Sequence, residues 1–403
     1  MILTKENILP YLRDVYPAFD QSVPVDVHVL GESEEDSVGL INHIFRVRTP
    51  NTSLIIKQGQ PNIRSAEGFE YLLPTTRNHL EAQSLRLRQA IVPQYIPQLY
   101  LEDPEHHIMV MEDVSYLPSC RLALTQGSAI PNLGLRCGDF MASIAFFTSE
   151  FYLPRTTFRT LGQRFGNHEM RRVMEEWSFF RRSPHPPCPE TLHLEPELQS
   201  QEIRSRIYLL RQHYMSHAEA LIHSDLHTGN LFASPQELKV IDMEYTFPGP
   251  CAYDPGYLLS SLLSLYCASF WLPLPHAPSA RAHQQYLLET MEELLVHYRR
   301  IFLELWQDHA KAEYRACPAY AHKFLDEIFP DAVGYAAVIS ITLSMRGPEI
   351  SEFQAIAQPG QRQQAIELYY AIAQTLLLSY PHIRTPEQLL QAIGACTQRY
   401  FAR

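Results

Sequence analysis

The chain has 403 residues, a net charge of -11 and 46% hydrophobic residues. A chain of this length buries a large core and usually divides into two domains. The acidic balance, without a dense Lys/Arg block, argues against nucleic acid as a main partner, because phosphate backbones select basic surfaces. The seven cysteines are scattered and form no C-x-x-C pair, as in proteins whose thiols stay reduced.

No targeting signal or membrane span is predicted. The first seven residues lack the basic start and apolar run of a signal peptide. The most apolar stretch, Gly256 to Pro273, is interrupted by four serines, and we expect a buried helix there rather than a membrane span. We therefore expect a soluble, cytoplasmic protein without a membrane partner.

Strand signals are concentrated in the first part of the chain. Residues 42–48 and 53–58 are short β-rich runs, separated by the turn sequence Thr49-Pro-Asn-Thr52. Residues 107–111 form a further predicted strand. Residues 77–90 are rich in helix formers and place Leu80, Ser84 and Leu87 on one face.

From Asn132 onward the pattern becomes helical. An apolar stripe at helical spacing predicts a core helix and consists of Cys137, Phe140, Met141, Ile144 and Phe147. The proline-rich residues 183–189 predict a surface loop. We predict an α+β fold with two lobes: residues 1–113 form a β-rich lobe with a helix, and residues 114–403 form a larger, mainly helical lobe. The connector lies near residues 112–118.

The segment Leu221-Ile-His-Ser-Asp-Leu-His-Thr-Gly-Asn230 and the following Val240-Ile-Asp-Met-Glu244 carry the chemistry. Phosphoryl transfer from ATP needs a carboxylate that orients the attacking hydroxyl, and amide and carboxylate oxygens that hold Mg²⁺. Asp225, Asn230 and Asp242 follow the order of these parts in the protein-kinase pattern. A solvated acidic hairpin is the alternative, but the spacing and the flanking apolar strands favour a bilobal protein-kinase-like fold.

Lys57 and Glu81 are the predicted phosphate-binding pair. A lysine at the end of an apolar strand can reach the α and β phosphates, and a helix glutamate usually holds it in place. A lone strand lysine ordinarily faces solvent, so this prediction depends on the downstream Asp225 motif.

The phosphate-binding loop is only weakly indicated. Gly39 and Asn42 follow an acidic segment and could bring donors near the phosphates, but no G-x-G-x-x-G is present and a plain hairpin turn is an open alternative. Glu112, Asp113 and Val114 occupy the connector, where backbone groups would read the adenine edge. His223 is expected to brace the loop through a backbone carbonyl, and His227 is not expected to act as the base.

At this level of detail the chain resembles the 5-methylthioribose kinase family, within the aminoglycoside- and choline-kinase-like group. The resemblance runs through most of the chain. It is carried by Ile44-Phe-Arg-Val, Ser53-Leu-Ile-Ile-Lys-Gln, Val110-Met-Glu-Asp-Val-Ser, Phe146-Phe-Thr-Ser, Ala220-Leu-Ile-His-Ser-Asp-Leu-His-Thr-Gly, Lys239-Val-Ile-Asp-Met-Glu and Tyr253-Asp-Pro-Gly256.

The resemblance implies ATP-dependent phosphorylation of the O1 hydroxyl of 5-methylthioribose, in methionine salvage. It makes Lys57 a phosphate ligand and the backbone from Met111 to Asp113 an adenine contact. Asp225 would contact the sugar hydroxyl, while Asp242 and Glu244 would hold Mg²⁺ and ATP, with Asn230 as a further possible ligand. It also implies a homodimer.

Several positions depart from the family pattern. The phosphate loop reads Val38-Gly-Leu-Ile-Asn42. Tyr71, a candidate contact to the substrate, stands where the family has a tryptophan in the loop before the helix. Where the family has a substrate-binding Arg-Arg pair, this chain has Met345-Arg346. A methionine cannot replace the forked hydrogen-bond donor of an arginine guanidinium. Arg346 is then the remaining candidate for holding the acceptor. A kinase of another sugar or amino alcohol, or a nucleotide-binding pseudokinase, stays open at this point.

Overall fold

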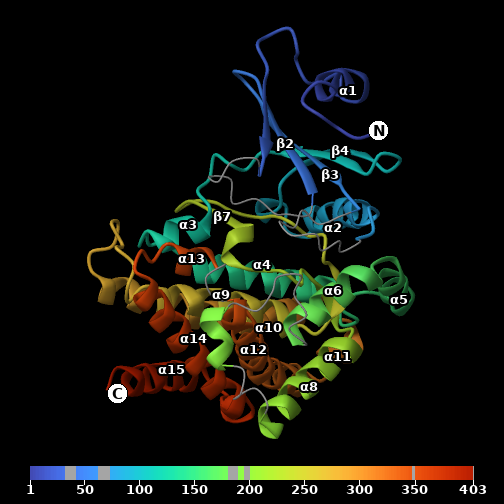
Figure 1. Cartoon of the computed structure of the whole chain (residues 1–403). Helices are drawn as coiled ribbons and strands as arrows, with labels where there is room; N and C mark the ends of the chain where they lie inside the picture. Colours follow the sequence, from blue (N-terminus) through green and yellow to red (C-terminus); the bar gives the residue numbers. More distant parts are fainter. Residues whose placement is uncertain (32–41, 62–72, 180–188, 195–199, 347–349, 403) are drawn as a thin grey trace.

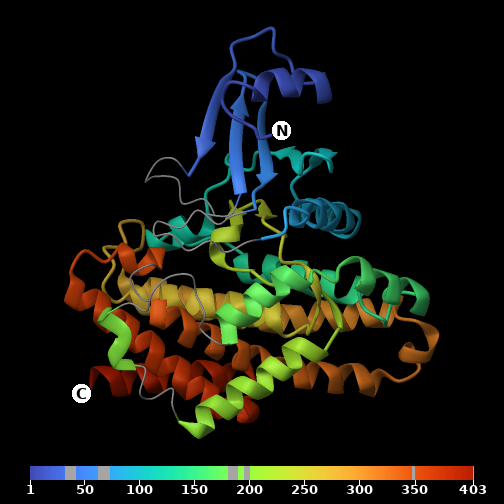
Figure 2. The same ribbon diagram turned by 45° about the vertical axis from the view of Figure 1, so that its right-hand side comes forward.

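The computed structural model describes residues 1–31, 42–61, 73–179, 189–194, 200–346 and 350–402, of which the side chains at positions 189, 190, 192 and 346 are excluded. A sheet lies at one end of the molecule and the long helices α12, α14 and α15 lie at the other (Figures 1 and 2). The predicted α+β architecture with two lobes is confirmed. The predicted loop at residues 183–189 falls almost entirely outside the described residues.

The sheet has five antiparallel strands in the order β1-β2-β3-β5-β4. Its strands are β1 (Asp26–Leu30), β2 (Asn42–Arg48), β3 (Ser53–Gly59), β4 (Leu99–Asp103) and β5 (Ile108–Glu112). The predicted strands at 42–48 and 53–58 are confirmed. The predicted strand at 107–111 begins one residue later, because His107 has a positive φ of 55° and belongs to the preceding turn.

Successive side chains of a strand point to opposite faces, and this alternation places Lys57. Leu54 and Ile56 of β3 pack into the cluster that includes α1 (Ile8–Val15). Ile55 packs on the opposite side, against the core that includes Ala82 and Leu85 of α2 (Arg77–Ile91). Lys57 therefore faces α2, one residue beyond the apolar part of the strand.

The remainder of the chain is mainly helical. The bounds are α3 (Cys120–Thr125), α4 (Leu133–Phe147), α5 (Arg155–Arg164), α6 (His168–Phe179), α8 (Gln201–Ser216), α9 (Tyr253–Ala268), α10 (Ala280–His309), α11 (Ala312–Arg315), α12 (Pro318–Arg346), α13 (Ser351–Gln354), α14 (Pro359–Ser379) and α15 (Pro386–Phe401), with 3₁₀ turns at Pro93–Tyr95, Pro189–Leu194, Thr228–Asn230 and Tyr380–His382. The stripe predicted at 137–147 lies in α4 and is largely buried. α4 packs closely along α10, because a Cβ at Gly134 would lie 2.5 Å from the Thr290 carbonyl oxygen.

Two apolar helices bear on the membrane question. The stretch from Gly256 forms most of α9, in which nearly every residue is buried, as predicted for a core helix. Among the described residues, Pro318–Met345 of α12 is long and apolar enough to cross a membrane by length and composition, but 83% of its apolar window is buried inside the structure. A buried core helix passes the same test, so this helix is weak evidence for a span.

Two short two-stranded sheets lie between the main sheet and the helices. β6 (Ala220–Ile222) pairs with β9 (Phe247–Gly249), and β7 (Leu231–Ala233) pairs with β8 (Leu238–Val240). The turn after β6 and the turn after β8 carry the polar motif found in the sequence. Both turns therefore open at the junction between the sheet and the helical part (Figure 1).

Candidate active site

The loop after β6 holds Asp225 in a fixed backbone conformation. The His223 Nε2 atom is hydrogen-bonded to the Ile241 carbonyl oxygen at 2.9 Å. The Nδ1 atom of the same ring accepts a hydrogen bond from the Asp225 N–H at 3.3 Å. The predicted bracing role of His223 is confirmed. Asn230 donates through Nδ2 to the Asp225 carbonyl at 2.9 Å, which leaves its own carbonyl oxygen as the atom that a cation would use.

A second carboxylate, which the sequence analysis did not identify, also holds this loop in place. Asp254, at the start of α9, accepts the backbone N–H groups of His223 at 2.6 Å and of Ser224 at 2.8 Å. Ser224 has a positive φ of 69°, a conformation that costs free energy in a residue other than glycine. The two bonds to Asp254 hold the loop in this conformation. In the sequence, this aspartate was noted only as part of the segment Tyr253-Asp-Pro-Gly256, which contributes to the family resemblance.

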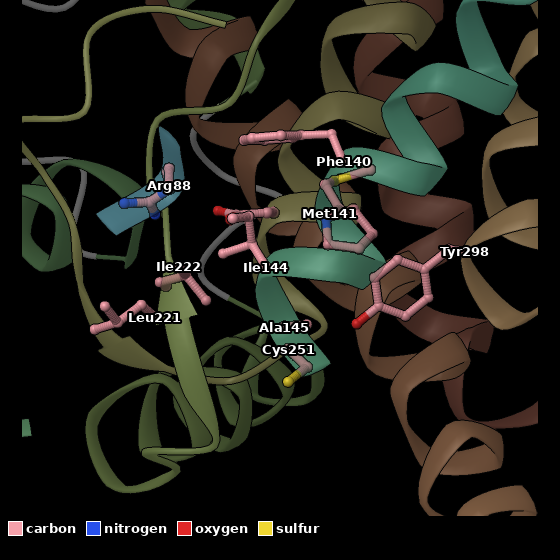
Figure 3. A pocket seen from close by; sticks show the side chains of 11 residues that line it. Arg88, Phe140, Met141, Ile144, Ala145, Leu221, Ile222, Cys251 and Tyr298 are labelled. Carbon is pink, nitrogen blue, oxygen red and sulfur yellow. The ribbon is translucent and has the colours of Figure 1, made fainter. Parts of the chain in front are cut away.

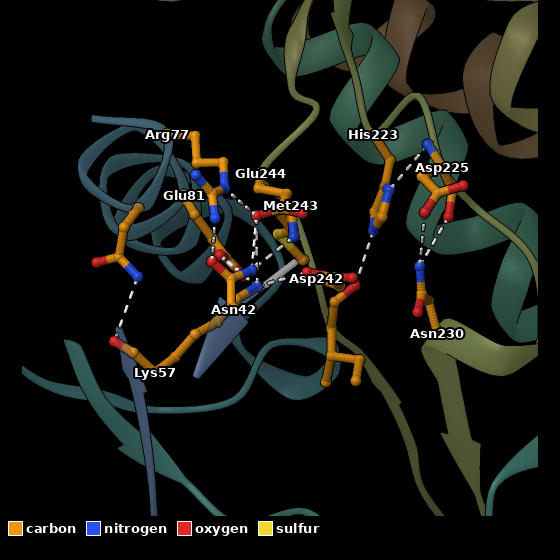
Figure 4. A network of polar contacts seen from close by, with 12 residues as sticks. Asn42, Lys57, Arg77, Glu81, His223, Asp225, Asn230, Asp242, Met243 and Glu244 are labelled. Atoms are coloured by element: carbon orange, nitrogen blue, oxygen red, sulfur yellow. Dashed lines mark hydrogen bonds and ion pairs between the residues drawn. The ribbon is translucent and has the colours of Figure 1, made fainter. Parts of the chain in front are cut away.

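Lys57 lies at the centre of a buried charge network (Figure 4). Its Nζ lies 2.7 Å from Glu81 Oε2, 2.5 Å from Asp242 Oδ1 and 3.9 Å from Glu244 Oε2. Burial alone would lower the pKa of Lys57, but the three carboxylates reverse this and raise it above its ordinary value. The structure therefore joins Lys57 to Glu81, as the sequence predicts, and adds a direct bond to Asp242.

Glu244 is held by a partner that the sequence analysis missed. Arg77, fully buried on α2, approaches Glu244 Oε2 through Nε at 3.2 Å. Asn42 donates to the same oxygen at 2.9 Å and accepts from Arg77 Nη2 at 2.8 Å. Arg77 lies four residues before Glu81, on the same face of the helix, and this spacing was the one available signal.

The arrangement of carboxylates fits a divalent cation. One oxygen from each of Glu81, Asp242 and Glu244 lies within 4.8 Å of the other two. Carboxylate and amide oxygens are the ligands that Mg²⁺ prefers. Asp242 is the most accessible of the three, with 29% of its side chain exposed, whereas Glu81 and Glu244 are almost fully buried.

Asp225 faces this negative cluster from the adjoining loop. Burial is the main cause that raises the pKa of Asp225 to about 7, and repulsion from Asp242 adds to it. Arg121 of α3 acts in the opposite direction. A carboxylate with a pKa near neutrality is suited to accept a proton from a hydroxyl group.

The other predicted site residues are only partly placed. Met111 is buried near the end of β5, and the Glu112 N–H donates to the carbonyl of Gln98, just before β4, at 2.8 Å, so this N–H already has a partner. The Asp113 side chain accepts from Ser53 Oγ at 2.5 Å. Gly39 and Tyr71 lie outside the described residues. Arg346 ends α12, and its side chain also lies outside the described part.

The sequence of the chain is similar to those of known proteins. Residues 33–294 match the model of a phosphotransferase enzyme family. A methylthioribose kinase from Geobacillus thermodenitrificans is 31% identical over 331 residues, covering 80% of this chain and 81% of the relative. One from Yersinia pseudotuberculosis is 28% identical over 368 residues, covering 89% of each chain.

The fold has a counterpart among solved structures. Choline kinase from Cryptosporidium parvum superposes with a TM-score of 0.50 at 13% identity, covering 96% of this chain and 100% of that chain. At this low identity the likeness concerns the fold alone.

Removal of the Glu244 carboxylate should destabilise the folded protein more than removal of the Asp242 carboxylate. Glu244→Ala removes the buried carboxylate that Arg77 contacts at 3.2 Å, and we expect a loss of about 3–5 kcal/mol in the free energy of unfolding. Asp242→Ala leaves Lys57 bonded to Glu81, and we expect a loss of roughly 1 kcal/mol. Urea unfolding of both variants measures the difference; equal losses would contradict the role given to Arg77.

His223 should make stability depend on pH. Burial lowers the pKa of His223 to about 4, with repulsion from Arg88 adding to the effect. The folded state therefore binds fewer protons than the unfolded state, in which a histidine pKa is about 6.5. The contribution of His223 is complete above that value and is lost as the pH falls toward 4.

Urea unfolding measures the free energy of unfolding at pH 7.5 and at pH 4.5. Between these values the wild type should lose about 2–3 kcal/mol more of this free energy than His223→Gln does. The glutamine keeps an N–H donor for the Ile241 carbonyl and does not titrate. Identical losses in the two proteins would show that His223 does not cause the pH dependence.

Proposed function

We propose that this chain, which belongs to the phosphotransferase enzyme family, transfers the γ-phosphoryl group of ATP to the O1 hydroxyl of 5-methylthioribose. The observation that carries the proposal is the contact of Lys57 with Asp242 at 2.5 Å, beside the loop that holds Asp225. The methylthioribose kinases that match the chain over most of their length support the choice of acceptor.

The nucleotide would lie between the sheet and the helical part. Lys57 would bind the α and β phosphates, and Glu81 would keep its ammonium group oriented. Binding would exchange the bond from Lys57 to Asp242 for bonds to phosphate oxygens. The remaining predicted nucleotide contacts are Gly39 and Asn42 beside the phosphates, and the backbone of Met111, Glu112 and Asp113 beside the adenine.

Asp242, Glu244 and Asn230 would hold the Mg²⁺ that accompanies ATP. When bound, the ion neutralises charge on the phosphates. Support comes from the charge balance of the described cluster, in which three carboxylates face the two cations Lys57 and Arg77.

Asp225 would align the acceptor hydroxyl and receive its proton as the oxygen attacks the γ-phosphorus. Its pKa of about 7 allows a large fraction to be ionised at neutral pH. No other residue is needed as a base, and His227, whose Nε2 lies 3.6 Å from Asp225 Oδ2, would orient this carboxylate. Arg346 and Tyr71 are the proposed contacts to the rest of the acceptor.

A kinase of another sugar or amino alcohol is the second candidate. It is favoured by Met345, which is buried and whose carbonyl accepts from Thr191 Oγ1 at 2.9 Å, where the resembling family has an arginine. The family's forked donor is therefore absent from this position. The division into lobes at residues 113 and 114, the homodimer and the cytoplasmic location also remain proposals.

The choice of acceptor is tested by ADP release with 5-methylthioribose, ribose, choline, ethanolamine and an aminoglycoside. We expect kcat/KM for 5-methylthioribose to exceed that for ribose and for the amino alcohols by roughly a hundredfold or more. A higher kcat/KM for an amino alcohol would replace the first candidate with the second.

Asp225→Asn should keep the fold and the KM for ATP but lower kcat by roughly a hundredfold or more, because the proton acceptor is lost. His227→Gln is the matched control, since its side chain lies beside the same carboxylate, and it should lower kcat by less than about tenfold. Near-normal turnover of folded Asp225→Asn would remove Asp225 from the mechanism, and a larger loss in His227→Gln would make His227 the base.

A further inference from the structure

Arg88 of α2 is a buried cation whose charge the proposed mechanism does not use. Its side chain is fully buried, and Nη1 donates to Ser84 Oγ. Nε and Nη2 have no hydrogen-bond partner among the described residues. Burial lowers the pKa of Arg88 to about 10, so the guanidinium stays charged at neutral pH. A buried charge with two unused donors requires a compensating group nearby.

Asp254 lines the same small cavity as Arg88, and the attraction of its carboxylate opposes the lowering of the Arg88 pKa by burial. Figure 3 shows the Arg88 side chain with the apolar side chains that line this cavity. The other lining residues are mostly apolar and include Phe140, Ile144 and Ile222. The cavity has a volume of about 10 Å³, close to the space that one water molecule needs. In such apolar surroundings the attraction between a guanidinium and a carboxylate is strong.

Arg88 also completes a polar stripe along one face of α2. Arg77, Glu81, Ser84 and Arg88 follow helical spacing, and all four are buried. Arg77 contacts Glu244, Glu81 accepts from the Met243 N–H at 3.3 Å, and Ser84 Oγ lies 3.0 Å from Thr246 Oγ1. The stripe thus runs from the carboxylates Glu81 and Glu244 toward α9, and Arg88 lies at its end, beside the cavity that Asp254 also lines.

We propose that Arg88 is a positioning residue: its guanidinium, through one water in the cavity, holds the Asp254 carboxylate in place, and Asp254 fixes the loop that carries Asp225. This links α2, which orients the phosphate lysine through Glu81, to the loop that aligns the acceptor. The role in turnover rests on the proposed phosphoryl transfer, but the effect on the loop does not.

The effect on the loop is measured by amide hydrogen exchange at residue resolution, without substrates. In Arg88→Met, which keeps an unbranched apolar side chain and removes the guanidinium charge, the His223 and Ser224 amides should exchange at least about tenfold faster than in the wild type. Arg86→Met is the matched control, because Arg86 lies on the same helix with half of its side chain exposed. It should leave both exchange rates unchanged.

The effect on turnover separates a positioning role from a structural one. Arg88→Met should lower kcat by about tenfold and change the KM for ATP by less than about twofold, since Lys57 and Glu81 are untouched. Arg88→Lys, which keeps the charge, should recover part of kcat. In an Asp254→Asn background, Arg88→Met should cause little further loss of kcat, because the two residues act through one contact.

Three results would overturn the proposal. One is an Arg88→Met protein with a lowered melting temperature but unchanged kcat and unchanged exchange at His223 and Ser224. Another is a double variant whose loss of kcat equals the product of the losses in Arg88→Met and Asp254→Asn, because the two residues would then act independently. The third is unchanged exchange of the His223 and Ser224 amides in Arg88→Met, combined with a wild type that phosphorylates no acceptor. By contrast, faster exchange in Arg88→Met without turnover in the wild type would reject the proposed function and retain the link between Arg88 and the loop.

Discussion

The buried charge of Lys57 is the constraint on which the site depends. A lysine taken out of water is stable only if carboxylates surround it, and here Glu81, Asp242 and Glu244 do so from two different parts of the chain. Glu81 belongs to α2, beside the sheet, whereas the other two follow β8 in the helical part. The requirement to neutralise this one ammonium group therefore holds the two parts of the molecule together.

The same network explains why the site suits a nucleotide and a cation. Arg77 compensates Glu244, so that two cations face three carboxylates, and Asp225 adds a further negative group on the adjoining loop. The surplus of negative charge attracts a divalent cation, and it helps to raise the pKa of Asp225. The charge balance that favours metal binding thus also prepares the carboxylate that receives the proton.

Much of the site follows from the sequence, because its motifs are local. The spacing of Asp225, Asn230 and Asp242 is set by the short strands β6, β7 and β8, and the alternation along β3 places Lys57 on the face toward α2. The structure brings these residues together with Glu81 as expected. Strands β2 and β3 also lie at their predicted positions, because their apolar runs are bounded by clear turn residues.

The missed residues are those whose role depends on distant contacts. Periodicity in α2 drew attention to Leu80 and Leu87, which are only partly buried, while the charged residues Arg77 and Arg88 are fully buried. An arginine on a helix usually faces solvent, so no local pattern identifies one that meets a carboxylate more than 150 positions away. Asp254 was missed for the same reason, because its partners are the backbone amides of another segment.

The most direct test is a crystal structure with Mg²⁺ and a non-hydrolysable ATP analogue. We expect Lys57 Nζ to leave Asp242, to contact α- and β-phosphate oxygens and to remain bonded to Glu81. The Asp242 carboxylate should then contact the metal ion. A complex in which Lys57 keeps its bond to Asp242 and the phosphates bind elsewhere would contradict the account.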